Sequence, residues 1–202
     1  MVRGPTAGIT SLSDADATLV GENTSDQAGT GVAWAGDVDG DGFADALIGA
    51  PGFDEGASNG GAVYLAYGPF VGTLDLRDLA GERLGDAADQ GLGAALACAG
   101  DIDGDGLSDL YIGAARARSG AAGAGGAGLG VGSSSATVDL SVAEATLLGE
   151  GEDDGLGGSV AGAGDLNRDD HADLLVGVAG ATGAAGEGAG QAAGFYGPLS
   201  GS

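Results

Sequence analysis

The sequence predicts an all-β protein built from three similar units, and two observations carry this prediction. Short apolar segments bounded by Gly, Asp and Asn recur along the chain, and their length and boundaries are typical of strands. The pattern also repeats, because acidic loops begin at Asp37, Asp101 and Asp165, each 64 positions after the last. Such constant spacing indicates a structural repeat in which every unit buries its apolar face against its neighbours.

The three units account for nearly all of the 202 residues. We expect a single domain with repeats at 8–71, 72–135 and 136–199, between short tails at 1–7 and 200–202. The repeats begin alike, as ITSLSDAD, TLDLRDLA and TVDLSVAE, and the segments before the loops align as VAWAGD, LACAGD and VAGAGD. Neighbouring units are expected to exchange a strand across these boundaries.

Short, partly β-branched runs follow the loops and are typical of buried strands. These runs are Ala46–Ile48, Leu110–Ile112 and Leu174–Val176. A further strand is expected at Ala62–Tyr67 and at Gln191–Tyr196, whereas its counterpart in the second unit, Ala127–Val131, has decayed. With about four short antiparallel strands and Gly-rich turns per unit, the pattern predicts β-propeller blades, whose radial repetition protects strand edges.

The loops read DVDGDGFAD, DIDGDGLSD and DLNRDDHAD, and each offers oxygen atoms at loop positions 1, 3, 5, 7 and 9. Calcium takes six to eight oxygen ligands in flexible geometry, so we predict one calcium site per loop. The expected ligands, with a backbone carbonyl at position 7, are Asp37, Asp39, Asp41, Phe43 and Asp45; Asp101, Asp103, Asp105, Leu107 and Asp109; and Asp165, Asn167, Asp169, His171 and Asp173.

The third loop departs from the other two. Arg168 and Asp170 stand where the first loop has Gly40 and Gly42, and Arg168 brings a positive charge close to the site. We therefore expect this degenerate loop to bind calcium more weakly or not at all.

The sequence disfavours two other interpretations of the loops. Ordinary acidic turns would explain one such loop, but three in register with the same offsets disfavour that interpretation. An EF-hand needs a glutamate at position 12, where this chain has Ile48, Ile112 and Val176.

The unit resembles the FG-GAP repeat of integrin α-subunits and their bacterial relatives, from about Gly8 to Pro198. The positions of the FG fragment read Ala28-Gly29, Leu92-Gly93 and Leu156-Gly157, and the GAP fragment is intact in Gly49-Ala50-Pro51. The resemblance implies that each calcium loop joins the first two strands of a blade. It also implies a role in adhesion or in binding a protein or glycan, outside the cell or at its surface.

Composition narrows the function classes. The chain has 30 acidic and 6 basic residues and a formal net charge of −24, which disfavours nucleic acid and anionic membranes as partners. Neither a transmembrane helix nor an apolar signal peptide is expected in this chain. With one His, one Cys and no zinc-ligand spacing, we expect no enzymatic activity. A propeller domain of a secreted hydrolase or lyase, or a purely structural repeat scaffold, remains the alternative.

Three blades are fewer than the four to eight with which propellers close. The segment Ile9–Val20 resembles an outer strand cut from a preceding blade, and it would complete the blade that ends near Tyr196. We therefore expect a homo-oligomer, with a dimer closing a six-bladed ring, or else the remainder of a longer propeller as the partner.

Overall fold

The protein is all-β in the computed structural model, which describes residues 11–79, 81–85, 88–102, 106, 108–116, 125–130, 145–183 and 186–198. The predicted fold class is confirmed. The described strands form four small sheets, three of them antiparallel, and the helical elements among them are two 3-10 turns, η1 (Leu12–Asp14) and η2 (Leu76–Asp78).

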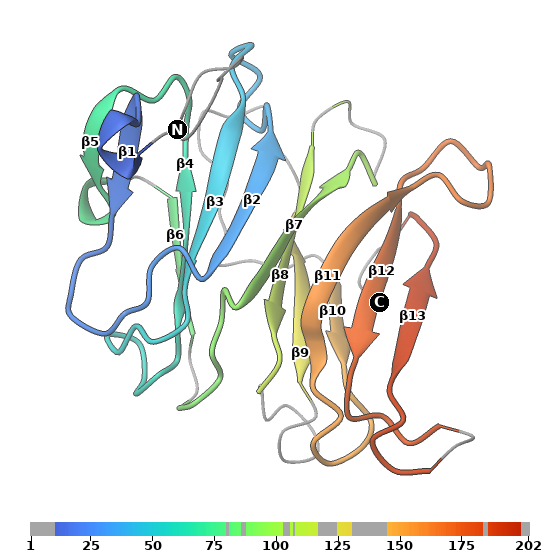
Figure 1. Ribbon diagram of the computed structural model, residues 1–202. Coiled ribbons are helices and arrows are strands. Elements are labelled where there is room, and N and C mark those ends of the chain that lie inside the picture. Colours follow the sequence, from blue (N-terminus) through green and yellow to red (C-terminus); the bar gives the residue numbers. More distant parts are fainter. Residues whose placement is uncertain are drawn as a thin grey trace.

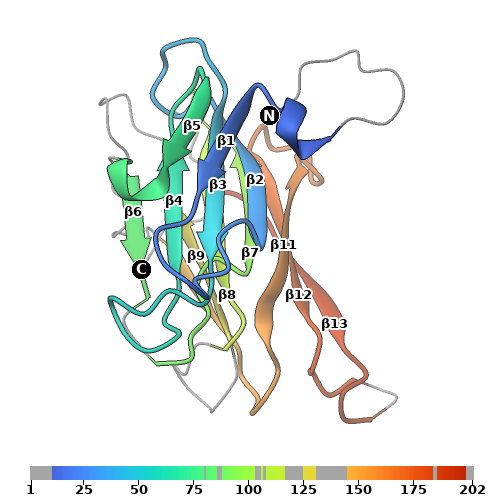
Figure 2. The same cartoon turned by 60° about the vertical axis from the view of Figure 1, so that its left-hand side comes forward.

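Three sheets are the expected blades, and they lie side by side from blade 1 to blade 3 (Figures 1 and 2). Blade 1 contains β2 (Gly31–Gly36), β3 (Asp45–Ala50), β4 (Ala62–Ala66) and β6 (Gly81–Leu84). Blade 2 contains β7 (Ala95–Gly100), β8 (Asp109–Ala114), β9 (Gly126–Gly130) and β10 (Ala145–Leu148). Blade 3 contains β11 (Leu156–Gly164), β12 (Asp173–Val178) and β13 (Gln191–Phe195), and no fourth strand joins it within the described residues. The outer strands β6 and β10 thus come from the repeat that follows their blade.

Each acidic loop connects the first two strands of its blade. Immediately before the loop a β-bulge interrupts the ladder, at Gly36, Gly100 and Gly164. These glycines have φ of +83°, +78° and +66°, a left-handed conformation that only glycine adopts without steric cost. The bulge bends the first strand, and the loop aspartate follows it directly.

One strand prediction was wrong. The apparently decayed segment of the second unit forms β9, which pairs with β8 on one side and with β10 on the other. The hydrogen bonds of a ladder come from the main chain, so a Gly-rich segment held between two strands needs little apolar character of its own.

Apolar side chains fill both contacts between blades. Between blades 1 and 2, Leu47 and Val63 pack with Leu110 and Ile112. Between blades 2 and 3, Ile102 and Tyr111 pack with Leu174 and Val176. Each fully buried side chain of this size contributes roughly 1.5–3 kcal/mol, so the stacking of blades supplies the core.

A parallel pair of strands, β1 (Ala17–Val20) and β5 (Gly72–Asp75), covers the face of blade 1 that is turned away from blade 2 (Figure 2). In this layer Ala17 and Leu76 pack with Ile48 and Tyr64. The pair covers β3 and β4, and side chains on β2 stay exposed on the same face.

Tyr111 gives a test of the contact between blades 2 and 3. Its side chain is buried, and its hydroxyl has no hydrogen-bond partner among the described residues. Burial, together with the charges of Asp109 and Asp173, raises the pKa of Tyr111 above its ordinary value of 10.0. The unfolded chain therefore loses this proton first, so the stability contributed by Tyr111 is complete below about pH 10 and is lost as the pH rises further.

We expect Tyr111→Phe to be as stable as the parent at pH 7, or more stable by up to about 1 kcal/mol, because an unpaired buried hydroxyl is removed. Between about pH 10 and 11 the variant should lose less stability than the parent. Thermal denaturation at pH 7, 10 and 11 measures both effects, and equal losses in the two proteins would contradict the account.

Candidate metal centres

The first loop brings three carboxylates together. Asp37, at the end of β2, Asp39 in the loop and Asp45 at the start of β3 each offer an oxygen, and these atoms lie within 4.8 Å of one another. The loop is folded around its own acids: the backbone N–H of Gly42 donates to Asp37 Oδ2 at 2.9 Å, and that of Phe43 donates to Asp41 Oδ1 at 2.8 Å.

The free oxygen of Asp37 fits a cation. Asp37 Oδ1 is buried and accepts no hydrogen bond from the described residues. Burial raises the pKa of the Asp45 carboxyl above its ordinary range, and the charges of Asp39 and Asp41 raise it further. A divalent ion among these groups would partner the orphaned oxygen and turn their mutual repulsion into attraction.

The aspartate at position 9 also has a structural role that the sequence did not reveal. Asp45 is 2% exposed, and its two oxygens accept the N–H groups of Val38 and Gly68, both at 2.9 Å. It therefore ties the loop to the end of β4. Asp173 repeats this arrangement in blade 3, where it accepts the N–H groups of Leu166 and Gly197.

The second loop is described at its two ends. Asp101 Oδ2 accepts the N–H of Gly106 at 2.9 Å, as Asp37 accepts that of Gly42, and Asp109 Oδ2 accepts the N–H of Ile102 at 2.6 Å. The expected ligands Asp103, Asp105 and Leu107 lie outside the described residues.

The third loop has a left-handed backbone at the same two positions as the first loop, although neither residue is a glycine. Arg168 and Asp170 have φ of 65° and 69°, close to the 76° and 90° of Gly40 and Gly42. The left-handed conformation costs a residue with a side chain roughly 1–2 kcal/mol, less for Asp, so the loop holds its shape under strain.

Contacts within the third loop use the atoms that a metal would need. Asn167 Nδ2 donates to Asp169 Oδ2 at 2.8 Å, and this bond, with the N–H of His171, lowers the pKa of Asp169. Asp165 accepts the N–H groups of Arg168, Asp169 and Asp170. The carboxylates of the third loop do not converge as those of the first loop do. Among the described residues, the acids whose oxygens lie within 4.8 Å of one another are Asp37, Asp39 and Asp45.

We expect the double variant Arg168→Gly/Asp170→Gly to repair the third loop. Glycine removes the left-handed strain, which should stabilise the fold by about 1 kcal/mol, and loss of the Arg168 charge should tighten calcium binding there. Calorimetric calcium titration and thermal denaturation measure the two effects. An unchanged titration would show that these residues do not limit the third loop.

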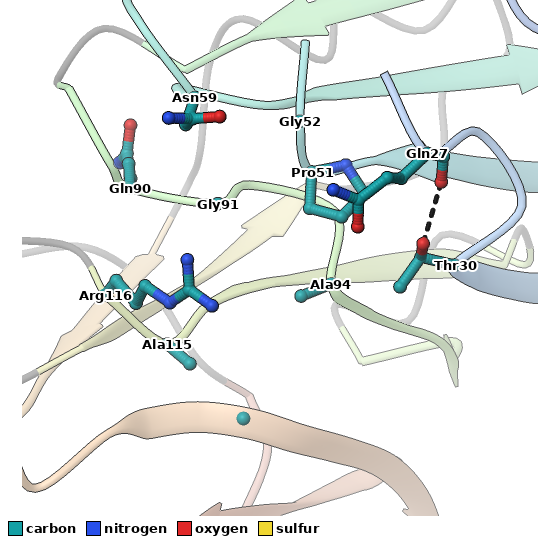
Figure 3. A pocket seen from close by; sticks show the side chains of 11 residues that line it. Gln27, Thr30, Pro51, Gly52, Asn59, Gln90, Gly91, Ala94, Ala115 and Arg116 are labelled. Carbon is teal, nitrogen blue, oxygen red and sulfur yellow. Dashed lines mark hydrogen bonds between the residues drawn. The ribbon is translucent and has the colours of Figure 1, made fainter. Parts of the chain in front are cut away.

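Two further features lie away from the loops. The acidic run Glu150–Asp154 forms a turn in which Asp154 Oδ2 accepts the N–H of Gly151 at 2.6 Å. A pocket of about 250 Å³ lies mainly between blades 1 and 2, with Gly158 of blade 3 also in its wall, at the ends of the strands opposite the acidic loops. Figure 3 shows the amides of Gln27, Asn59 and Gln90 and the guanidinium of Arg116 around it. The sequence did not predict this pocket, because its walls come from separate turns, although Pro51 of the GAP fragment lines it.

Parts of the chain are similar to known proteins. The FG-GAP repeat family matches residues 28–65 and 93–129, which lie in the first two repeats. Integrin alpha-X of Homo sapiens is 40% identical over 104 residues, which cover 49% of this chain and 9% of the integrin. Integrin alpha pat-2 of Caenorhabditis elegans is 34% identical over 98 residues, covering 48% of this chain and 8% of the relative.

These matches span less than a tenth of the curated relatives' length. Among the described residues, no helix is long and apolar enough to cross a membrane. FG-GAP repeats are propeller blades, in agreement with the sheets described above. Since the matched segments contain the first two acidic loops and their flanking strands, the first two units of this chain are FG-GAP repeats similar to those of integrin α-chains.

Proposed function

We propose that this chain is a calcium-stabilised propeller module that binds a protein or glycan partner outside the cell or at its surface. The observation that carries the calcium assignment is the convergence of Asp37, Asp39 and Asp45 around a buried oxygen of Asp37 that has no described partner. Oxygen-only ligands of this kind suit calcium, and extracellular modules bind it at about 10⁻⁴–10⁻³ M.

Calcium here would act on stability. Two carboxylates about 4 Å apart repel each other by roughly 1 kcal/mol in water and about 4 kcal/mol at an effective dielectric of 20, so an empty loop tends to open. An ion bound to Asp37, Asp39 and Asp45 would fasten the β2–β3 connection, and Asp45 extends that fastening to Gly68. Binding energy then becomes folding energy.

Partner binding is supported by the similarity to integrin α-chains and by the pocket between blades 1 and 2. Its amides and Arg116 can hydrogen-bond sugar hydroxyls or carboxylates. Arg116 is one of only 6 basic residues in a chain of net charge −24, so an acidic group on a partner has few other places to dock.

A hydrolase or lyase domain is the second candidate, and the arrangement of groups disfavours it. Gly56–Gly60 (GASNG) has the letters of a G-x-S-x-G nucleophile motif, but it lies in the loop between β3 and β4 and no helix follows it. His171, the single histidine, lies two blades away in the third acidic loop. Turnover of a polysaccharide panel that His171→Ala abolishes, with the fold intact, would favour the enzyme.

The calcium proposal is tested by a pair of matched variants in chelator-stripped protein. Asp39→Asn removes one charge from the converging trio, whereas Asp54→Asn removes one from an acid outside the loops that accepts the N–H of Asn59. Calorimetric titration should show one calcium ion fewer in Asp39→Asn and an unchanged number in Asp54→Asn. Equal binding in both variants would reject the first-loop site.

A further inference from the structure

We propose that blade 3 of one copy packs against blade 1 of a second copy, and that β1 of the second copy becomes the fourth strand of that blade 3. Two copies joined twice in this way form a closed ring of six blades. The inference does not depend on calcium binding. It follows from comparing the two contacts between blades inside the chain with the surfaces exposed at its ends, which are blade 3 and the part of blade 1 at β2 that the β1–β5 pair leaves uncovered.

One contact recurs at both junctions within the chain. A Cβ on Gly49 of blade 1 would collide with the carbonyl oxygen of Gly93 in blade 2, and a Cβ on Gly113 of blade 2 would collide with that of Gly157 in blade 3. The next pair in the series is Gly177 with Gly29. Gly29 has open space around it, and the atoms nearest to a Cβ on Gly177 belong to Ser159 of its own blade.

A second contact recurs in the same direction. Gly61 forms a parallel bridge with Leu92, and Gly125 forms the equivalent bridge with Leu156. In blade 3 the equivalent of these glycines is Gly190, which has the same left-handed φ. Its partner in the series would be Ala28, which is exposed, whereas Leu92 and Leu156 are buried.

A third contact involves the bulge glycines. Gly36 closely approaches Ser108 of the next blade, and Gly100 closely approaches Ala172. The equivalent glycine of blade 3, Gly164, has nothing within 4 Å of a Cβ position. In all three series, therefore, one position on blade 3 and one on blade 1 lack, among the described residues, the contact that their equivalents make with the neighbouring blade.

The surfaces exposed at the two ends of the chain carry apolar side chains at positions whose equivalents are buried between blades. Leu47 and Tyr111 are 0% and 1% exposed between blades, but the equivalent Leu175 is 41% exposed. Val38 and Ile102 are both 0% exposed, and the equivalent Leu166 is 56% exposed. We call this surface of blade 3 the tail face.

The head face lies on blade 1. Val32 and Trp34 of β2 are 69% and 66% exposed there. Their equivalents Leu96 and Val160, and Cys98, lie at the junctions between blades, where Leu96 and Val160 pack against the cores. The head and tail faces are thus the two halves of one repeated contact, which a second copy supplies.

The strands at the two ends of the chain, β1 and β13, also correspond to a pair of neighbouring strands in the other blades. By repeat position β1 corresponds to β6 and β10, which pair antiparallel with β4 and β9, and β13 corresponds to β4 and β9. In the described residues β1 is paired on one side, with β5, and β13 on one side, with β12. The register of the other blades places Val20 opposite Gln191 and Thr18 opposite Ala193 of the other copy. Figure 1 shows β1 and β13 at opposite ends of the molecule, so one chain cannot pair them itself.

The number of copies follows from geometry. A contact between two different faces gives a ring when the rotation closes and an open filament when it does not. Propellers close with four to eight blades, and six is the multiple of three in that range. Further blades of a longer chain are the competing occupant of the two faces.

Sedimentation velocity at micromolar protein in calcium buffer tests the ring. We expect the parent chain to be a dimer and Leu175→Glu to be a monomer with an unchanged circular dichroism spectrum. The matched control is Leu148→Glu, because Leu148 is 49% exposed on β10 and its equivalents Leu84 and Val20 are similarly exposed at 36% and 43%. This variant should remain a dimer. A monomeric parent, or open-ended larger species, would overturn the proposal.

A disulfide fixes the register independently of variant stability. In a Cys98→Ala background, Thr18→Cys/Ala193→Cys should oxidise to a covalent dimer, because the two positions face each other between copies. Thr18→Cys/Gln191→Cys, two residues out of register, is the control. A failure of the first pair to cross-link, or equal cross-linking by both pairs, would overturn the strand exchange.

Discussion

Removal of calcium with EGTA is expected to lower the melting temperature of this protein by about 10–20 °C. A ligand at 100 times its Kd stabilises the native state by about 2.7 kcal/mol per site, and the first two loops have complete ligand sequences. For a chain of this size each kcal/mol shifts the melting temperature by about 2–4 °C. Thermal denaturation followed by circular dichroism measures the shift.

The control for chelation is the return of a different ion. Calcium added back in excess should restore the melting temperature, whereas magnesium should restore little of it, because Mg²⁺ demands octahedral geometry and keeps its waters. A melting temperature that EGTA leaves unchanged would mean that the loops are acidic turns that fold without an ion.

Asp45→Ala is expected to destabilise the protein by about 2–5 kcal/mol even in EGTA. The variant leaves the N–H groups of Val38 and Gly68 without their acceptor, and each buried donor left unpaired costs about 1–3 kcal/mol. Asp45→Asn keeps one side-chain acceptor and should lose about half as much. Urea unfolding in EGTA isolates this effect, since calcium cannot contribute there.

Asp39→Asn is the matched control for this measurement. Asp39 accepts the N–H of Asp41 at the exposed surface of the same loop, and its charge raises the pKa of Asp45. In EGTA the variant should be as stable as the parent or slightly more stable, because a repulsion is relieved. Equal losses in Asp45→Ala and Asp39→Asn would show that Asp45 has no role beyond that of its neighbours.

The spacing of the loops predicted most of the fold, because a repeat of 64 residues constrains each unit by the other two. Strand β9 was missed since its pairing depends on the neighbouring strands and hardly on its own side chains. The parallel β1–β5 pair was also missed, because an alignment of repeats cannot show which element covers the first blade.

The structure brings together part of the predicted site. Asp37, Asp39 and Asp45 converge, whereas Asp41 lies in the same loop outside that trio. The tie from position 9 to the third strand had no separate signal in the sequence, because position 1 (Asp37, Asp101 and Asp165) is an aspartate in all three loops just as position 9 is.

Native mass spectrometry of chelator-stripped protein returned to calcium tests the central claim most directly, because it counts bound ions on each chain. The account predicts at least two calcium ions per chain, with the third loop filling last, and one ion fewer in Asp39→Asn. A chain that takes up no calcium would contradict it.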